Sequence, residues 1–171
     1  MGQAPGQETP ITSIDLSSFS QTSGHPIVAF LTGDGRDPSG LTLDELLDSP
    51  DTTLEARHDF IQWLFPLDEP SRAVPGSPVL TPDDIAMIRA SGRALANLHA
   101  ATERMRRFYA RTHGWRVGHD HNHLRITRII RSLRLLAGDA PADGFRAHIL
   151  ALLGSDRDAV SETTVQFWTT A

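Results

Sequence analysis

The chain has 171 residues and a formal net charge of −5, a length that indicates one compact domain. All 16 basic residues are arginine and there is no cysteine, which excludes disulfide frameworks, thiolate metal centres, cysteine nucleophiles and lysine Schiff-base chemistry. No apolar run approaches the roughly 18 residues of a membrane-spanning helix, so we expect no membrane partner.

Charge is divided unevenly along the chain. Residues 1–84 carry −11 and residues 85–171 carry +6, and nine arginines lie between Arg104 and Arg134 with Asp120 as the one acid among them. A basic surface of this kind can bind phosphates, but the whole chain is acidic and aromatic residues are not interleaved for base stacking. We therefore expect most arginines to be neutralised within the fold, with the acidic segment 42–48 as one partner, and nucleic acid is the least favoured ligand.

The first half of the chain predicts an arm followed by helices. Residues 1–24 are rich in Gly, Pro, Ser and Thr and predict a flexible N-terminal arm ahead of a helical domain over 25–171. The apolar run 27–31 is too short to distinguish helix from strand. Two capping boxes, Thr42 to Glu45 and Thr52 to Glu55, predict helix starts. The second of these helices runs from Leu54 to about Leu64, before a proline-rich surface loop over 66–80.

The second half predicts longer helices. Thr81 and Pro82, followed by two aspartates, form a strong helix start, and apolar spacing continues that helix to about Arg111. Further helices are predicted over 124–137, 142–153 and 158–168, and no segment alternates as a strand does. The expected fold is therefore all-α, a single domain of about six helices with one long central helix.

A first polar motif lies within the predicted helix 54–64. Glu55, His58 and Gln62 fall on one helical face, where a carboxylate beside an imidazole can serve acid–base chemistry. Glu-x-x-His is also a metal-ligand spacing of helical bundles, although such sites carry two copies and this chain shows one. The alternative is structural: Glu55 completes the capping box and His58 makes an internal hydrogen bond.

A second polar motif contains three alternating histidines, His119, His121 and His123. If the segment is extended, the three rings point to one side and could take a metal, with Glu55 or Asp59 among the candidates for a further ligand. If the helix already begins at 121, they diverge. A His-x-His pattern alone is weak, and no metal residue is assigned.

Both motifs resemble one known family. The stretch from Leu54 to Pro66 (LEARHDFIQWLFP) and that from His121 to Leu133 (HNHLRITRIIRSL) resemble the opioid growth factor receptor conserved region, over about residues 27–171. The animal members are named for binding an enkephalin peptide in nuclear growth regulation. The lysine-free composition indicates a bacterial member, for which an opioid peptide is an implausible ligand.

The resemblance implies a ligand-binding, signalling-type domain, and we expect it to bind a small molecule or peptide between helices. We also expect a cytoplasmic location and no cofactor. We expect the two motifs to meet there. The candidate catalytic residues are His58, Glu55 and His121, and the candidate ligand-binding residues are Asp59, Gln62, Trp63, Asn122, Arg125 and Arg128. Two alternatives stay open: a small enzyme of natural-product biosynthesis using His/Glu acid–base chemistry, and a structural protein-interaction module. Self-association into a homo-oligomer is also open.

Overall fold

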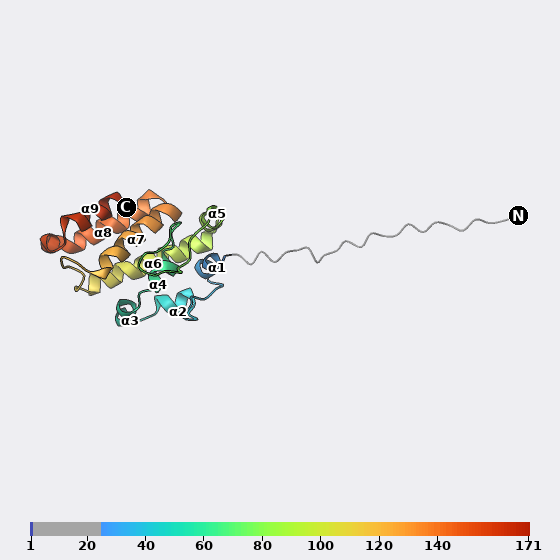
Figure 1. Cartoon of the computed structure of the whole chain (residues 1–171), viewed down its shortest axis with the longest axis horizontal. Coiled ribbons are helices and arrows are strands. Elements are labelled where there is room, and N and C mark those ends of the chain that lie inside the picture. Colours follow the sequence, from blue (N-terminus) through green and yellow to red (C-terminus); the bar gives the residue numbers. More distant parts are fainter. Residues whose placement is uncertain (2–24) are drawn as a thin grey trace.

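The structure, a computed structural model, describes Met1 and residues 25–171, so the predicted arm lies almost wholly outside the described residues. Within the described part the regular structure is helical, and one isolated bridge joins Leu67 to Val79. The all-α prediction is confirmed (Figure 1).

Nine α-helices and one 3₁₀ helix make up the described domain. They are α1 (Pro26–Thr32), α2 (Leu43–Leu47), α3 (Asp51–Ala56), α4 (Phe60–Leu64), α5 (Pro82–Ala90), α6 (Gly92–Arg111), α7 (His121–Leu136), α8 (Asp139–Leu153), η2 (Gly154–Ala159) and α9 (Glu162–Thr170).

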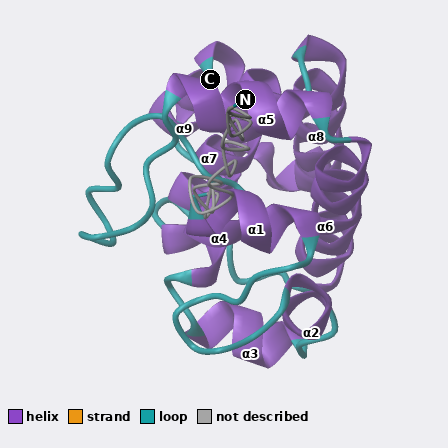
Figure 2. Cartoon of the chain, turned by 90° about the vertical axis from the view of Figure 1, so that its right-hand side faces the viewer, coloured by secondary structure: helices purple, strands orange, loops and turns teal. Residues whose placement is uncertain are grey.

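The three longest helices form the centre of the domain. Helices α6, α7 and α8 pack against one another, α9 packs on α7, and α1, α2 and α5 pack on α6. Figures 1 and 2 place α8 and α9 on one side of the molecule and the short helices α2 and α3 on the opposite side. This arrangement brings the first polar motif, at the end of α3, beside the start of α7.

Aromatic side chains fill the core beneath that junction. Tyr109 of α6 contacts Trp115 edge-on with a centroid distance of 5.5 Å, and Trp115 contacts Trp168 of α9 at 6.5 Å. His123 also lies edge-on to Trp168, at 5.6 Å. These rings are buried, and they fix the start of α7 against α6 and α9.

The helix number exceeds six because two of the predicted helices are broken and the undecided run 27–31 forms α1. The predicted helix 82–111 ends at Ala90, because Ser91 has an extended ψ of 105° and its hydroxyl accepts the N–H of Ala94 as the cap of α6. The predicted helix 54–64 is also wrong: α3 ends at Ala56, Arg57 is extended with ψ 138°, and α4 begins at Phe60.

Two of the predicted helix caps are confirmed and one is wrong. The Thr42–Glu45 box is present at α2, and the Thr81 start is present as a box that Asp84 completes. The Thr52–Glu55 box is wrong, because α3 begins at Asp51 with no side-chain cap. The Glu55 carboxylate instead bonds across the fold to α7.

Smaller differences concern the later helices. Helix α7 begins three residues before the predicted start, since Asp120 caps it, and it ends as predicted before Gly138, whose φ is 97°. Helix α8 begins at Asp139 because a proline is tolerated in a first turn. The predicted last helix is shifted: η2 takes residues 154–159, and α9 starts after Ser161.

Several arginines are neutralised within the chain, as the charge asymmetry predicts. Arg104 pairs with Asp51 at 2.7 Å and donates to the main-chain oxygens of Leu47 and Ser49 at 2.9 and 2.7 Å. The segment 42–48 therefore offers Arg104 a carbonyl oxygen, whereas its own Glu45 pairs with Arg36 at 3.2 Å.

Candidate functional site

The candidate site lies where the end of α3 meets the start of α7. The last turn of α3 places Glu55 there and the turn between α3 and α4 places His58, while the start of α7 contributes Asp120, His121 and Asn122. The expectation that the two motifs meet is confirmed for these residues, although Glu55 and His58 no longer share one helix.

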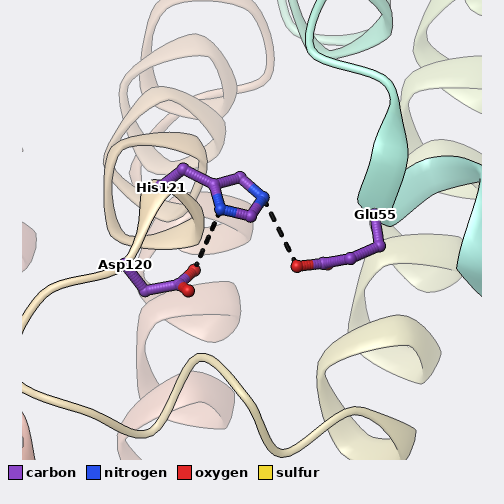
Figure 3. Close-up of side chains that lie close together, drawn as sticks. All are labelled: Glu55, Asp120 and His121. Atoms are coloured by element: carbon purple, nitrogen blue, oxygen red, sulfur yellow. Dashed lines mark ion pairs between the residues drawn. The ribbon is translucent and has the colours of Figure 1, made fainter.

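A row of three ionisable side chains forms the exposed part of the site. Nε2 of His121 lies 3.4 Å from Oε1 of Glu55, and Nδ1 of the same ring lies 3.5 Å from Oδ1 of Asp120. Figure 3 shows the imidazole between the two carboxylates. The side chains are 43%, 39% and 20% exposed for Glu55, His121 and Asp120. Solvent and ligands therefore have access to the row.

His58 extends this row on the side of the α3–α4 turn. Its ring lies edge-on to that of His121, with centroids 5.4 Å apart and planes at 81°. His58 is exposed, so its side chain is free to rotate without disturbing the core. Two imidazoles and two carboxylates, from segments more than 60 residues apart, thus gather at one surface point; we call Glu55, His58, Asp120 and His121 the polar cluster.

Two buried polar residues support the polar cluster from below. Nδ2 of Asn122 donates to both carboxylate oxygens of Glu55 at 3.2 Å, while Oδ1 accepts a hydrogen bond from Nη1 of Arg125 at 3.1 Å. The Asn122 main-chain N–H donates to Asp120 at 2.8 Å, so Asp120 caps α7.

Arg125 explains the break between α3 and α4. Its Nη2 donates to the main-chain oxygens of Glu55, at 3.4 Å, and of Arg57. These carbonyls end α3, where the helix offers them no N–H partner. The guanidinium also lies 5.2 Å from the centre of the Phe60 ring and is 3.9 Å from the Glu55 carboxylate. Burial lowers the pKa of Arg125, and its donors are directed at the protein.

The other predicted ligand-binding residues lie away from the row. Arg128 is partly buried and its Nε donates to the main-chain oxygen of Phe65 at 2.8 Å. The Gln62 side chain is buried, and with its nitrogen toward the turn it donates to the carbonyls of Asp59 and His58 at 2.9 and 3.1 Å. Trp63 packs edge-on against Phe30 at 5.5 Å. These contacts hold α4 and its flanking turns in place.

Asp59 contributes to the site through Arg57. The Arg57 guanidinium donates to Asp59 at 3.3 Å and to the buried Asp37 at 2.8 Å. Asp37 in turn accepts the main-chain N–H of Leu41 at 2.9 Å, which fixes the loop before α2. The turn that presents His58 is therefore anchored on both sides.

The three alternating histidines diverge, because α7 begins at His121. His123 is buried and its Nε2 lies 2.8 Å from the main-chain oxygen of Trp115, whereas His119 and His121 are exposed. The compact set of metal-type ligands in the described chain is instead Glu55, Asp120 and His121, whose ligand atoms lie within 4.8 Å of one another.

Two functional neighbours were missed by sequence reasoning. Asp120 was noted only as an isolated acid, although an aspartate at the position before a helix is a recognisable cap signal. Tyr109 is buried below the site, and among the described residues its hydroxyl has no hydrogen-bond partner. Burial raises the pKa of Tyr109, and the charge of Arg125 opposes that shift only partly. No local pattern marks such a residue.

Two hollows of the surface lie elsewhere. One, of about 630 Å³, is lined by η2 and α9 from Arg157 to Thr169, and another, of about 460 Å³, lies between α2 and α6 beside Asp48 and Arg107. Neither contains a predicted site residue. The polar cluster is thus an exposed surface site, and the inter-helix pocket stays a prediction.

Comparison with known proteins identifies the class of domain. The sequence profile of the "Opioid growth factor receptor (OGFr) conserved region" matches residues 29–114, half of the chain. The chain therefore belongs to the opioid growth factor receptor conserved-region family. The match includes Glu55 and His58 and ends before α7 begins.

Two curated relatives are proteins named opioid growth factor receptor. The proteins of Mus musculus and of Rattus norvegicus are each 34% identical to this chain over 119 residues, covering 56% of it. The chain spans about a fifth of the length of these relatives, 18% and 20% respectively. No solved structure matches the chain significantly. Within the described residues, no helix is long and apolar enough to cross a membrane.

Proposed function

We propose that this domain binds a small molecule or peptide at the polar cluster. The observation that carries the proposal is that four ionisable side chains from two distant segments converge while remaining open to solvent. The neighbouring Asn122 and Arg125 are buried and already engaged with the protein. Side chains that the fold positions but does not bury are the ones available to a ligand.

The contacts favour a smaller set of ligand-binding residues than the sequence analysis named. Arg125, Arg128 and Gln62 hold main-chain carbonyls in place, so we assign them the positioning of the site. Glu55, His58, Asp120 and His121 are assigned to the ligand. Carboxylates and imidazoles are suited to a nitrogen or oxygen group of the ligand, such as an amine or a hydroxyl.

The family relationship supports binding rather than a purely structural role. Both curated relatives carry the word receptor in their names, and the region that the family profile matches includes α3 and the turn that presents His58. From these relatives we infer that the domain binds a ligand, but we do not infer that it binds the same ligand as those receptors.

Acid–base catalysis is the second candidate function, because one observation favours it. Asp120 and Glu55 face opposite nitrogens of His121, and a carboxylate that orients an imidazole is the arrangement by which enzymes move protons. A small helical enzyme acting on its ligand by dehydration, cyclisation or isomerisation would use the same residues.

A thermal-shift screen of the full chain tests the proposal. A library of small amines, alcohols, carboxylates and short peptides is added to the wild type and to the double variant Glu55→Gln/His121→Gln. A ligand at one hundred times its Kd adds about 2.7 kcal/mol of stability, which corresponds to roughly 5–10 °C in Tm for a domain of this size. The double variant His99→Ala/Asp83→Asn, changed at exposed side chains of α6 and α5, is the matched control.

Three outcomes decide the matter. Ligands that raise the Tm of the wild type and the control, but not of the cluster variant, support binding at the cluster. Ligands that stabilise all three proteins equally, or no ligand at all, would contradict it. Hits recovered unchanged by NMR favour binding, whereas conversion of a hit that depends on His121 favours the enzyme.

A further inference from the structure

Three members of the polar cluster, Glu55, Asp120 and His121, have ligand atoms spaced closely enough to hold a metal ion. We propose that the polar cluster binds one divalent transition-metal ion, with Glu55 and His121 as ligands, His58 as the third ligand, and Asp120 as the residue that positions His121. The inference rests on the proposed function in one respect. The coordination position of the metal ion that the protein leaves open would receive a nitrogen or oxygen atom of the bound small molecule or peptide.

The spacing of the ligand atoms supports a tetrahedral ion. Bonds of about 2.0–2.1 Å in a tetrahedral zinc site put neighbouring ligand atoms roughly 3.3 Å apart. Nε2 of His121 and Oε1 of Glu55 are 3.4 Å apart. An ion can therefore lie between these two atoms with little movement of either side chain.

Asp120 occupies the place of a supporting carboxylate. Histidines that bind metals usually donate their other N–H to a carboxylate or carbonyl, which fixes the ring. Nδ1 of His121 faces Oδ1 of Asp120 at 3.5 Å while Nε2 faces Glu55. Glu55 is oriented in the same manner, since Asn122 donates to both of its oxygens. Glu55 and His121 thus each have a second residue that holds their direction.

His58 is near enough to complete the ligand set. Two imidazoles bound to one tetrahedral ion have ring centroids on the order of 5 Å apart, given the metal–nitrogen bond length. The rings of His58 and His121 are 5.4 Å apart. The compact ligand set excludes His58 in its present orientation, but the side chain is exposed and can turn a ring nitrogen toward the ion. Two histidines and a glutamate leave the fourth position open.

The donor set also selects the kind of ion. Imidazole with carboxylate suits zinc, cobalt, nickel and copper, whereas calcium and magnesium prefer oxygen ligands alone. The positive N-terminus of α7 and the Arg125 guanidinium, 3.9 Å from Oε2 of Glu55, oppose a cation. The carboxylates of Glu55 and Asp120 offset that opposition. We therefore expect micromolar rather than nanomolar affinity.

Metal binding is tested with metal alone on the full chain. The untagged protein, stripped with EDTA, is titrated with Zn²⁺ by calorimetry and with Co²⁺ by visible spectroscopy, where intense d–d bands report tetrahedral coordination. We expect one equivalent to bind, no comparable binding of Mg²⁺, and at least a tenfold loss of affinity in Glu55→Gln, His121→Gln and His58→Ala. Asp120→Asn is expected to lose about 10–100-fold, as changes of supporting residues do.

Matched histidine variants keep the result specific. His99→Ala removes an exposed imidazole from α6 and is expected to leave the affinity unchanged, and thermal melts verify that each variant is folded. Absence of Zn²⁺ binding at 100 µM protein, or equal losses in His99→Ala and the cluster variants, would overturn the inference. A loss of Zn²⁺ affinity in His119→Ala without such a loss in Glu55→Gln would also overturn the inference, because the ion would then bind at the loop that carries His119 and not at the polar cluster.

The ligand screen repeated with EDTA separates the two proposals. Hits that survive EDTA while Zn²⁺ fails to bind would refute the metal and leave ligand binding standing. Zn²⁺ binding at the cluster with no hit in either screen would refute ligand binding and leave the metal. Hits that require Zn²⁺ support both.

Discussion

Replacing Arg125 should destabilise the whole domain, because this side chain joins α7 to the end of α3. The test substitution is Arg125→Met, which keeps much of the apolar length of the side chain and removes its donors. Lost with it are the hydrogen bonds to the carbonyls of Glu55 and Arg57, the bond to Asn122 at 3.1 Å, and the contact with the Phe60 ring.

The size of the effect follows from these contacts. Hydrogen bonds from a charged donor are each worth about 1.5–3 kcal/mol, and a partly buried cation–π contact about 1 kcal/mol. The variant no longer has to desolvate a guanidinium in the folded state, and this gain offsets part of the lost stability. We expect a net loss of about 3 kcal/mol, which lowers the Tm by roughly 6–12 °C for a chain of this length.

Urea unfolding followed by circular dichroism measures the loss, with two comparison variants. Arg131→Met lies on the same helix and removes an exposed ion pair with Glu69, so we expect no more than about 0.5–1 kcal/mol. Arg125→Lys keeps the charge without the planar fork and should fall between. If Arg125→Met loses less than 1 kcal/mol, or no more than Arg131→Met, the assignment of Arg125 to the fold is wrong.

Three further outcomes are expected. Burial raises the pKa of Tyr109, the one tyrosine of the chain, above its ordinary value of 10.0. The contribution of Tyr109 to the free energy of unfolding is therefore complete below pH 10 and is lost as the pH rises further. Tyrosinate absorbance should appear only together with unfolding, and a separate titration near pH 10 in the folded protein would contradict this. Gly35→Ala should cost about 1–3 kcal/mol in urea unfolding, because the new Cβ would lie 2.8 Å from the main-chain nitrogen of Phe30; Gly92→Ala, where the Cβ meets no atom within 4 Å, should be neutral or stabilising, and equal losses would refute the steric argument. Thr81→Ala removes the capping box of α5 and should cost about 1 kcal/mol, a prediction that fails if the melting curve is unchanged.

The helical class of the fold could be predicted because its signals are local. A capping box such as Thr42 with Glu45, or a glycine with positive φ such as Gly138, acts within a few residues of its own position. The apolar spacing of α6 and α7 likewise reports the face that each helix buries.

The breaks in the predicted helices could not be read from the same signals. Residues 54–64 have the apolar spacing of one helix, yet Arg125, some 70 positions later in the sequence, takes the carbonyls at which the chain turns. A serine at position 91 is compatible with a helix interior and with a cap, and in the structure its hydroxyl accepts the Ala94 N–H and caps α6. At residues 54–64 a tertiary contact overrode local propensity.

The sequence by itself determined the family, the helical class and most residues of the polar cluster, because unusual polar residues in helical spacing are visible without coordinates. Only the tertiary structure decided their roles. It placed Arg125, Arg128 and Gln62 on main-chain carbonyls, and it left Glu55, His58 and His121 open to solvent beside Asp120. The physical reason is that a side chain's role depends on which of its donors and acceptors the fold already occupies, and for Arg125 and Arg128 those partners come from segments about 60 to 70 residues away.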